Sequence, residues 1–240
     1  MKRIVKRLLI ALLIICALAL AAIFIWANDT YAPTAEVAEL VALDDAKTAD
    51  GYTFSAQNSD VGIILYAGAK VEPSAYSYYA SELANRGYNV FIPNLRLNFA
   101  IFDVDAATRI IEQNEHISSW YVSGHSLGGV AAAMYAAAHD NIDGLVLLAS
   151  YPNDDLSASA LSVLSLYAEH DGLTTLADIE ASKNKLPKTA VFIEIAGGNH
   201  AQFGLYGEQD GDKAATITPL EQQRVMIDET VLWLKEQQHE

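Results

Sequence analysis

The chain has 240 residues, a formal net charge of −15 and a hydrophobic content of 52%. Without its first thirty or so residues, it has the length of one domain rather than two. It carries no basic footprint, so nucleic acid is excluded as a partner, and we expect a neutral or cationic substrate. The only cysteine, Cys16, excludes an intramolecular disulfide and cysteine-rich zinc motifs. No ligand cluster is evident in the sequence, and we expect neither a metal nor an organic cofactor.

The N-terminal segment has the pattern of a membrane anchor. A basic segment over residues 1–7 precedes an uncharged apolar stretch over residues 8–27. A helix of that length spans about 30 Å, the thickness of the hydrocarbon core. Because lysine and arginine favour the cytoplasmic side, we expect a single-pass protein of the cell membrane whose remaining chain is extracytoplasmic. The stretch exceeds the roughly 7–15 apolar residues of a cleavable signal, which favours a signal anchor over a cleaved signal peptide or a buried helix.

The rest of the chain predicts a tether and one α/β domain. Residues 28–49 mix alanine, threonine, proline and acids, and we expect them to form the tether. Over residues 50–240, short apolar runs alternate with longer helical patterns, which predicts a mostly parallel sheet with helices on both faces. In chain order, we expect strands at 61–66, 88–92, 120–123, 145–149, 163–167 and 190–195, and helices at about 73–87, 100–115, 127–139, 174–185 and 219–238.

A nucleophile motif lies between two of these elements. The sequence Gly-His-Ser-Leu-Gly-Gly at 124–129 fits the pattern G-x-S-x-G between a predicted strand and a predicted helix. A sharp strand-to-helix turn places its middle residue, Ser126, at the tip, and glycines two before and two after avoid steric overlap. The helix N-terminus then directs backbone N–H groups at the place where an oxyanion forms. We therefore predict that Ser126 is a nucleophile.

The acid of a Ser–acid–His triad follows the serine in the chain in this arrangement. Asp171 comes directly after the strand at 163–167, at the carboxyl end where open α/β sheets place their sites. Glu169, Asp154 and Asp155 are alternatives. We favour Asp171 because Gly172 permits the turn that directs a carboxylate at an imidazole.

The base is predicted at His200, in the turn after the strand at 190–195. His125 and His170 are alternatives: the first is adjacent to Ser126 in sequence and too close to reach its hydroxyl in line, and the second lies beside the acid. In the predicted mechanism, His200 takes the Ser126 proton and Asp171 orients the imidazole.

Two backbone N–H groups are expected to stabilise the oxyanion. One is the N–H of Leu127, directly after the nucleophile, and the other comes from the loop after the strand at 61–66. In that loop the sequence leaves Gly68 and Ala69 open as the donor.

The segments 65–71, 124–129, 149–152 and 198–204 resemble a group of bacterial hydrolase-like proteins related to dienelactone hydrolases, within the α/β-hydrolase superfamily. The superfamily resemblance extends through nearly all of the chain after the anchor. It implies the α/β-hydrolase fold and an esterase-like activity. Two features depart from the pattern: Tyr66-Ala67 replaces the frequent His-Gly at the oxyanion loop, and Ser126 replaces the cysteine nucleophile of dienelactone hydrolases. Lactone specificity is therefore not implied.

The predicted function is that of a membrane-anchored serine hydrolase with a small-molecule acyl substrate. Only about a dozen residues follow Ala149 before the next strand, where this fold usually carries its cap, so we expect no large cap domain. The polar, glycine-rich stretch 202–218 is either one wall of the site or a surface loop. The alternatives in function are an acyltransferase or cofactor-free haloperoxidase on the same triad, and a non-catalytic binding module.

Overall fold

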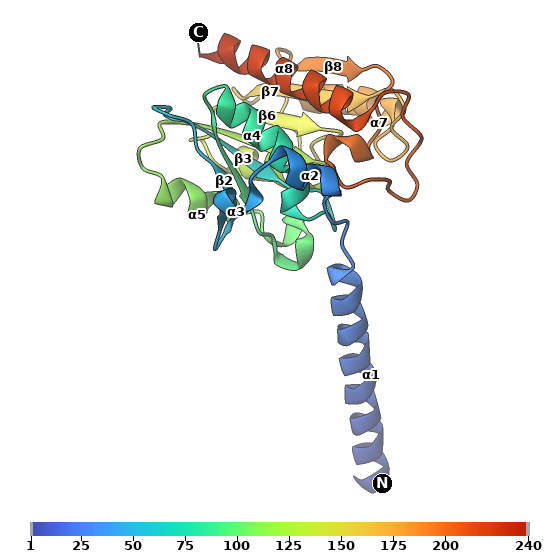
Figure 1. The fold of residues 1–240 in the computed structure, drawn as a ribbon. Helices are drawn as coiled ribbons and strands as arrows, with labels where there is room; N and C mark the ends of the chain where they lie inside the picture. Colours follow the sequence, from blue (N-terminus) through green and yellow to red (C-terminus); the bar gives the residue numbers. More distant parts are fainter. Residues whose placement is uncertain (1, 239–240) are drawn as a thin grey trace.

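A computed structural model describes residues 2–238, so Met1 and the last two residues of the predicted domain lie outside the described part. The domain is built on one eight-stranded sheet in the order β1-β2-β4-β3-β5-β6-β7-β8 (Figure 1). Its two leading strands, β1 and β2, pair antiparallel, as do β2 and β4, and the pairs from β4 through β8 are parallel. The strands are β1 (Lys47–Thr48), β2 (Gly51–Phe54), β3 (Val61–Tyr66), β4 (Asn89–Pro93), β5 (Ser119–His125), β6 (Gly144–Leu148), β7 (Ser162–Ala168) and β8 (Val191–Ile195).

The core lies along the central parallel strands. Every residue of β3, β4 and β6 is buried, and their sequences are almost continuously apolar. Such runs are typical of parallel strands covered on both faces. By contrast, β1 and β8 are the edge strands, and much of each is exposed.

Helices cover the sheet and fix its connections. The helices α4 and α8 pack against each other in front of the sheet in Figure 1, where Tyr79 Oη and Thr230 Oγ1 lie 2.8 Å apart and both residues are buried. The helix α6 packs on β3, β5 and β6. The α-helices of the domain are α2 (Ala35–Leu40), α3 (Leu43–Ala46), α4 (Ser77–Asn85), α5 (Ala106–Gln113), α6 (Leu127–Ala138), α7 (Leu176–Ser182) and α8 (Pro219–Gln237). Short 3-10 turns are η1 (Pro73–Tyr76), η2 (Arg96–Asn98), η3 (Ala100–Phe102), η4 (Lys183–Lys185) and η5 (Ala201–Phe203).

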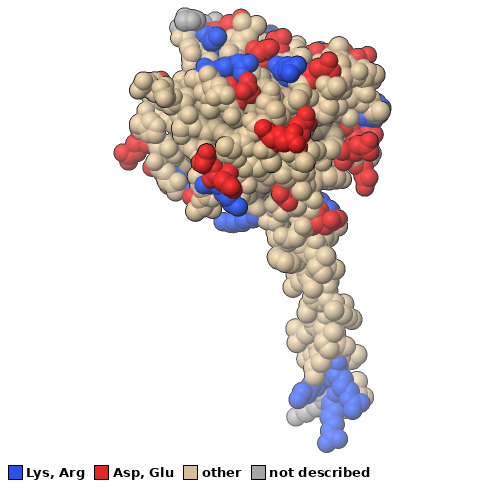
Figure 2. Space-filling model, viewed as in Figure 1, with Lys and Arg blue, Asp and Glu red and all other residues tan. Residues whose placement is uncertain are grey.

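One long helix, α1 (Lys2–Asn28), stands away from the domain (Figure 1). Its stretch from Arg3 to Asn28 is apolar and long enough to cross a membrane, and the most apolar part has no buried residue. In Figure 2 the stalk of this helix is free of charged side chains between the cluster of basic residues at its far end and the domain. Length and composition alone do not distinguish such a membrane span from an N-terminal signal sequence.

The structure differs from the sequence-based expectation in three places. The expected tether at 28–49 instead contains α2, α3 and β1, and it is anchored by the fully buried Val37. The sequence prediction missed the edge strands β1 and β2. The expected helix at 100–115 is divided into η3 and α5, because the buried carboxylate of Asp103 lies between them and pairs with Arg109 at 3.2 Å.

Candidate active site

The turn at Ser126, called the elbow below, has the backbone strain that the motif predicts. Ser126 lies between β5 and α6 with φ 54° and ψ −125°, in the left-handed region that side chains rarely adopt. A Cβ at Gly124 would lie 2.4 Å from the carbonyl carbon of Gly128, and a Cβ at Gly128 would lie 2.3 Å from the carbonyl oxygen of Tyr66. These are backbone atoms that cannot move aside. Glycine is therefore required where the elbow packs against the end of β3.

The loop after β6 holds the elbow from the other side. Ser150 Oγ donates a hydrogen bond to the Ser126 carbonyl at 2.6 Å, and the Ser126 N–H donates to the Leu148 carbonyl at 2.9 Å. A Cβ at Gly129 would lie 2.5 Å from Ser150 Oγ, so this third glycine of the motif makes room for the hydroxyl. Sequence reasoning gave Ser150 no role, although it lies in one of the segments on which the family resemblance depends.

Asp171 and His200 form a buried pair. His200 Nδ1 donates to Asp171 Oδ2 at 2.8 Å, and neither side chain has exposed surface. The other carboxylate oxygen, Oδ1, accepts the N–H groups of Leu173 at 2.8 Å and Thr174 at 2.6 Å. These bonds fix the carboxylate and place a proton on Nδ1, so Nε2 is the ring nitrogen that remains without a protein partner within residues 2–238. That atom is buried.

The elbow and the buried pair meet at the carboxyl edge of the sheet. The ring of His125, the residue before the serine, lies 4.6 Å from the ring of His200. Among the described residues, no hydrogen bond joins Ser126 Oγ to His200. Such bonds are often long or poorly aligned in enzymes without substrate.

The alternative acids have other partners or none. Glu169 accepts the N–H of Gly197 at 2.9 Å, and Asp155 accepts the N–H of Ser157 at 2.9 Å. Both are exposed, as is Asp154. Asp171 is thus the acid that the structure brings to His200.

His125 belongs to a separate buried network. The Gly68 N–H donates to Tyr76 Oη at 3.0 Å, so the tyrosine proton is left for His125 Nδ1, 2.8 Å away. Burial lowers the pKa of His125 well below its usual value, and the neighbouring His200 lowers it further. His125 is therefore a neutral imidazole with its proton on Nε2. This geometry also engages the N–H of Gly68, whereas the N–H of Ala69 has no partner within residues 2–238.

Asp212 joins the two turns that carry the pair, and sequence reasoning missed it. Its Oδ1 accepts the N–H of Gly172 at 3.0 Å, and its Oδ2 accepts the N–H of Ala201 at 2.9 Å. These are the residues directly after Asp171 and His200. A Cβ at Gly172 would also lie 2.6 Å from the Gly211 carbonyl oxygen, so the loop packs closely here. The stretch 202–218 therefore holds the turns that carry Asp171 and His200.

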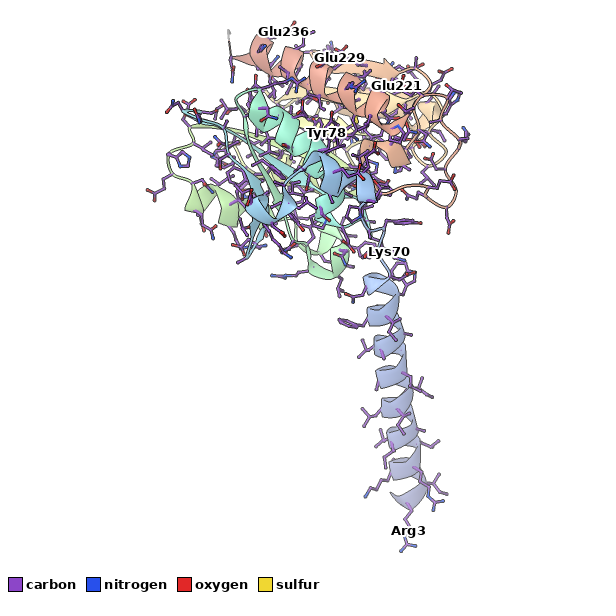
Figure 3. All side chains as sticks on the ribbon, in the orientation of Figure 1. Arg3, Lys70, Tyr78, Glu221, Glu229 and Glu236 are labelled. Carbon is purple, nitrogen blue, oxygen red and sulfur yellow. The ribbon has the colours of Figure 1, made fainter. Side chains whose placement is uncertain are left out.

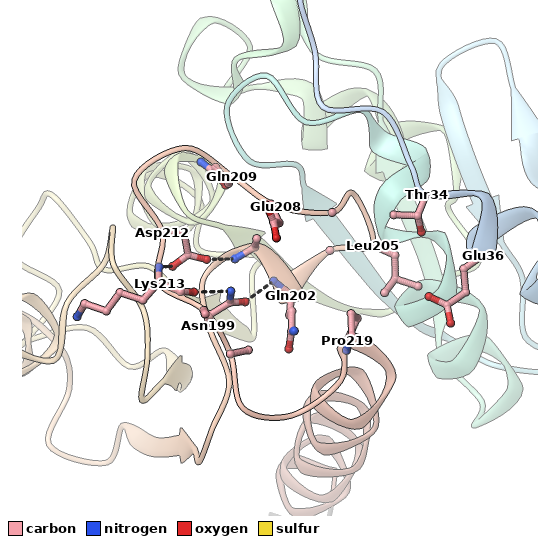
Figure 4. A pocket seen from close by; sticks show the side chains of 15 residues that line it. Thr34, Glu36, Asn199, Gln202, Leu205, Glu208, Gln209, Asp212, Lys213 and Pro219 are labelled. Atoms are coloured by element: carbon pink, nitrogen blue, oxygen red, sulfur yellow. Dashed lines mark hydrogen bonds between the residues drawn. The ribbon is translucent and has the colours of Figure 1, made fainter.

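A cavity of about 550 Å³ is lined in part by this loop (Figure 4). Its lining includes Thr34, Glu36, Gln202 and Pro219, but not Ser126. It includes neither member of the buried pair. The cavity therefore lacks the elbow serine and the buried pair, the groups that would be candidates for chemistry.

The described part of the chain shows no candidate metal centre. Within residues 2–238, no group of histidine, cysteine, aspartate and glutamate side chains is arranged to hold a metal ion.

Solved structures share the fold at low sequence identity. Est1E from Butyrivibrio proteoclasticus has a TM-score of 0.60 and 13% identity, over 79% of this chain and 94% of that one. A predicted CIB-like hydrolase from Thermoplasma acidophilum has a TM-score of 0.59 and 14% identity, over 75% of this chain and 90% of that one. A structure from a study of carboxylesterases of the thaumarchaeon Nitrososphaera gargenis has a TM-score of 0.59 and 13% identity, over 78% of this chain and 94% of that one.

No curated protein sequence matches the chain. A family model does: residues 62–224 match the model described as Alpha/beta hydrolase family. The matched range runs from β3 to the second turn of α8 and includes the elbow and the buried pair. Because this match covers more than half of the chain, the protein belongs to the Alpha/beta hydrolase family.

Proposed function

We propose that the protein is a membrane-anchored serine hydrolase that cleaves carboxylic esters, with Ser126 as nucleophile, His200 as base and Asp171 as the acid that orients it. The observation that carries this proposal is the buried Asp171–His200 pair, whose imidazole ring lies 4.6 Å from the ring of His125, the residue before the strained Ser126. A buried imidazole with one nitrogen fixed by a carboxylate and the other unpartnered is suited to accept a proton.

The reaction proceeds through an acyl-enzyme. Ser126 Oγ attacks the ester carbonyl carbon while His200 Nε2 takes the hydroxyl proton, and Asp171 stabilises the resulting imidazolium. The bond from the carbonyl carbon to the alcohol oxygen breaks, and His200 gives its proton to that oxygen. A water molecule then attacks the acyl-enzyme with the same base. The products are one alcohol and one carboxylic acid, and the serine is regenerated.

The oxyanion is stabilised by two backbone N–H groups. The N–H of Leu127, at the first position of α6, has no acceptor within its own helix and lies at the positive end of the helix dipole. For the second donor we favour Ala69 over Gly68, because the N–H of Gly68 is already bonded to Tyr76. Donors of this kind contribute about 2.7–4 kcal/mol each to the transition state.

The names of two structural neighbours agree with an ester as substrate. One structural neighbour comes from a study of carboxylesterases, and another carries the name Est1E. Their identity to this chain is too low to indicate more than the fold, so the proposal depends on the site geometry. The anchor is the apolar helix α1, and the basic residues before it favour an extracytoplasmic domain.

An active-site probe tests the proposal. The full-length protein in detergent should react covalently with an organophosphonate and should hydrolyse short acyl esters, and Ser126→Ala should lose both properties. Loss of the serine costs about 10⁶ in turnover in comparable triads. Ser157→Ala, at an exposed serine, is the matched control and should retain labelling. Labelling that persists in Ser126→Ala would contradict the assignment.

A further inference from the structure

The helix α1 meets the domain without a flexible linker. Ala27, near its end, is only 2% exposed, and the ring of Trp26 stacks on Phe99 with centroids 5.6 Å apart. Asn98 Nδ2 donates to the Ala27 carbonyl at 3.5 Å. Only a few residues later, Tyr31 already pairs with the loop after β3. The end of a membrane span is therefore fixed against the domain at η2 and η3.

The same junction is bonded to the proposed oxyanion loop. The Tyr31 N–H donates to the Lys70 carbonyl at 2.7 Å, and the Lys70 N–H donates to the Asn98 carbonyl at 2.9 Å. Figure 3 shows Lys70 where α1 joins the domain, and its Nζ lies 4.9 Å from the centre of the Trp26 ring. Lys70 follows Ala69 directly in the chain. The proposed oxyanion donor is thus one residue away from contacts with the membrane-proximal end of α1.

Apolar side chains are exposed at this junction. On η2 and η3, Leu97 and Ile101 are each 40% exposed and Phe102 is 55% exposed, while Trp26 on α1 is 56% exposed. We call these four residues the docking patch. The turn η3 also packs on α6, the helix that begins after Ser126. Exposed apolar patches of this kind mark interaction surfaces, and this one contacts both α1 and α6.

We propose that the docking patch rests in the outer surface of the bilayer that α1 spans, and that Ser126 acts on an amphipathic long-chain acyl ester held in that leaflet. This inference rests on the proposed function. With residues 8–27 spanning the hydrocarbon core, Trp26 lies at the outer boundary of that core, where such rings are favoured. Its partner Phe99 fixes the patch at the same level.

A chain without a cap between β6 and β7 suits such a substrate. The described segment between β6 and β7 contains no helix or strand that would cover the catalytic edge. A lipid ester then needs to bring only its carbonyl to Ser126, while its acyl chain remains in the membrane beside Ile101 and Phe102. A substrate that never leaves the leaflet avoids the cost of exposing its acyl chain, about 0.8 kcal/mol per CH₂.

Fluorescence measures the docking separately from activity. In a Cys16→Ala background, Phe102→Cys carries an environment-sensitive fluorophore, and the full-length protein is placed in phospholipid nanodiscs. Leu232→Cys is the matched control: Leu232 is 56% exposed and lies on α8, at the end of the domain opposite α1 (Figure 1). We expect a blue-shifted emission from the first site only. Equal emission from both sites would overturn the docking.

Activity tests the substrate class. In the same nanodiscs, hydrolysis of a bilayer-embedded diacylglycerol is compared with hydrolysis of a water-soluble butyrate ester. Phe102→Ser should lower the ratio of the first rate to the second by about tenfold, the effect of about 1.4 kcal/mol, and Leu232→Ser should leave the ratio unchanged. Hydrolysis of the butyrate ester without hydrolysis of the diacylglycerol would overturn the substrate class. Inactivity of the wild type toward both would overturn the proposed function, and the fluorescence result would still decide the docking.

Discussion

Asp212 offers the sharpest test of how the acid and the base are held. Asp212→Ala removes the acceptor for the N–H groups of Gly172 and Ala201, which follow the two members of the pair. Hydrogen bonds to a charged group contribute about 1.5–3 kcal/mol each, and two of them amount to about 3–6 kcal/mol. Because Asp212 is partly exposed, water replaces part of this loss. We expect the free energy of unfolding to fall by about 1–3 kcal/mol.

The catalytic effect should be about as large as the effect on stability. Without the carboxylate, the turns that carry Asp171 and His200 are free to separate, and a displacement of about 1 Å lowers turnover by about 10²-fold. Asp212→Asn should be almost as impaired, because its carbonyl oxygen and its amide cannot both accept an N–H. The side chain of Asp212 lies behind the pair, so KM should change little.

Steady-state kinetics on a soluble ester, with kcat and KM separated, measure this effect, and urea denaturation gives the stability. Asp210→Ala is the matched control, because Asp210 is exposed in the same loop two residues earlier. Both variants are assayed as full-length chains in detergent. A kcat of Asp212→Ala within twofold or so of the wild type, together with lower stability, would refute the reasoning and leave Asp212 a purely structural residue.

Four further predictions follow from the site and the anchor. Asp171→Asn should lower kcat by about 10⁴-fold while the phosphonate still labels the protein slowly; an unchanged kcat would move the acid elsewhere. Gly128→Ala places a Cβ 2.3 Å from the Tyr66 carbonyl oxygen, so it should cost about 1–3 kcal/mol of stability in urea denaturation and lower kcat more than it raises KM. The pKa of His125 is lowered in the folded state, so as pH falls below 6.5 the unfolded state binds its proton first, and stability should fall by at most about 1.4 kcal/mol per pH unit; His125→Gln should flatten this slope in urea midpoints measured at several pH values. Protease added to intact cells should digest the chain beyond Asn28, and full protection there with cleavage in lysed cells would reverse the topology.

Most of the fold was predictable because its signals are local. The strand at 61–66 is confirmed as β3, with the same bounds, because its continuous apolar run is typical of a strand buried on both faces. The elbow was predictable for a similar reason: the glycines of the motif and the strained Ser126 lie within one turn of chain. The positions of Asp171 and His200 followed from the order of strands, since the carboxyl ends of neighbouring parallel strands meet at one edge. Their catalytic roles remain predictions.

The edge of the sheet and the junction with α1 were not predictable in this way. The segment 28–49 is short of periodic apolar residues, and its α2, α3 and β1 are stabilised by contacts with distant parts of the chain. Tyr31, for example, pairs with Val71. A segment whose order depends on such contacts has no pattern of its own, so it was interpreted as a tether.

The sequence by itself determined the order of the core elements, the elbow and the turns in which an acid and a histidine follow the sheet. Only the tertiary structure decided what supports them. Gly172 and Asp212 are 40 residues apart, and their hydrogen bond joins two loops. The network of Gly68, Tyr76 and His125 likewise joins separate elements. It bonds the N–H of Gly68 to Tyr76, whereas the sequence left Gly68 and Ala69 open as oxyanion donors. The physical reason is that a polar contact between loops depends on where the fold brings two backbones together, and neither periodicity nor local spacing carries that information.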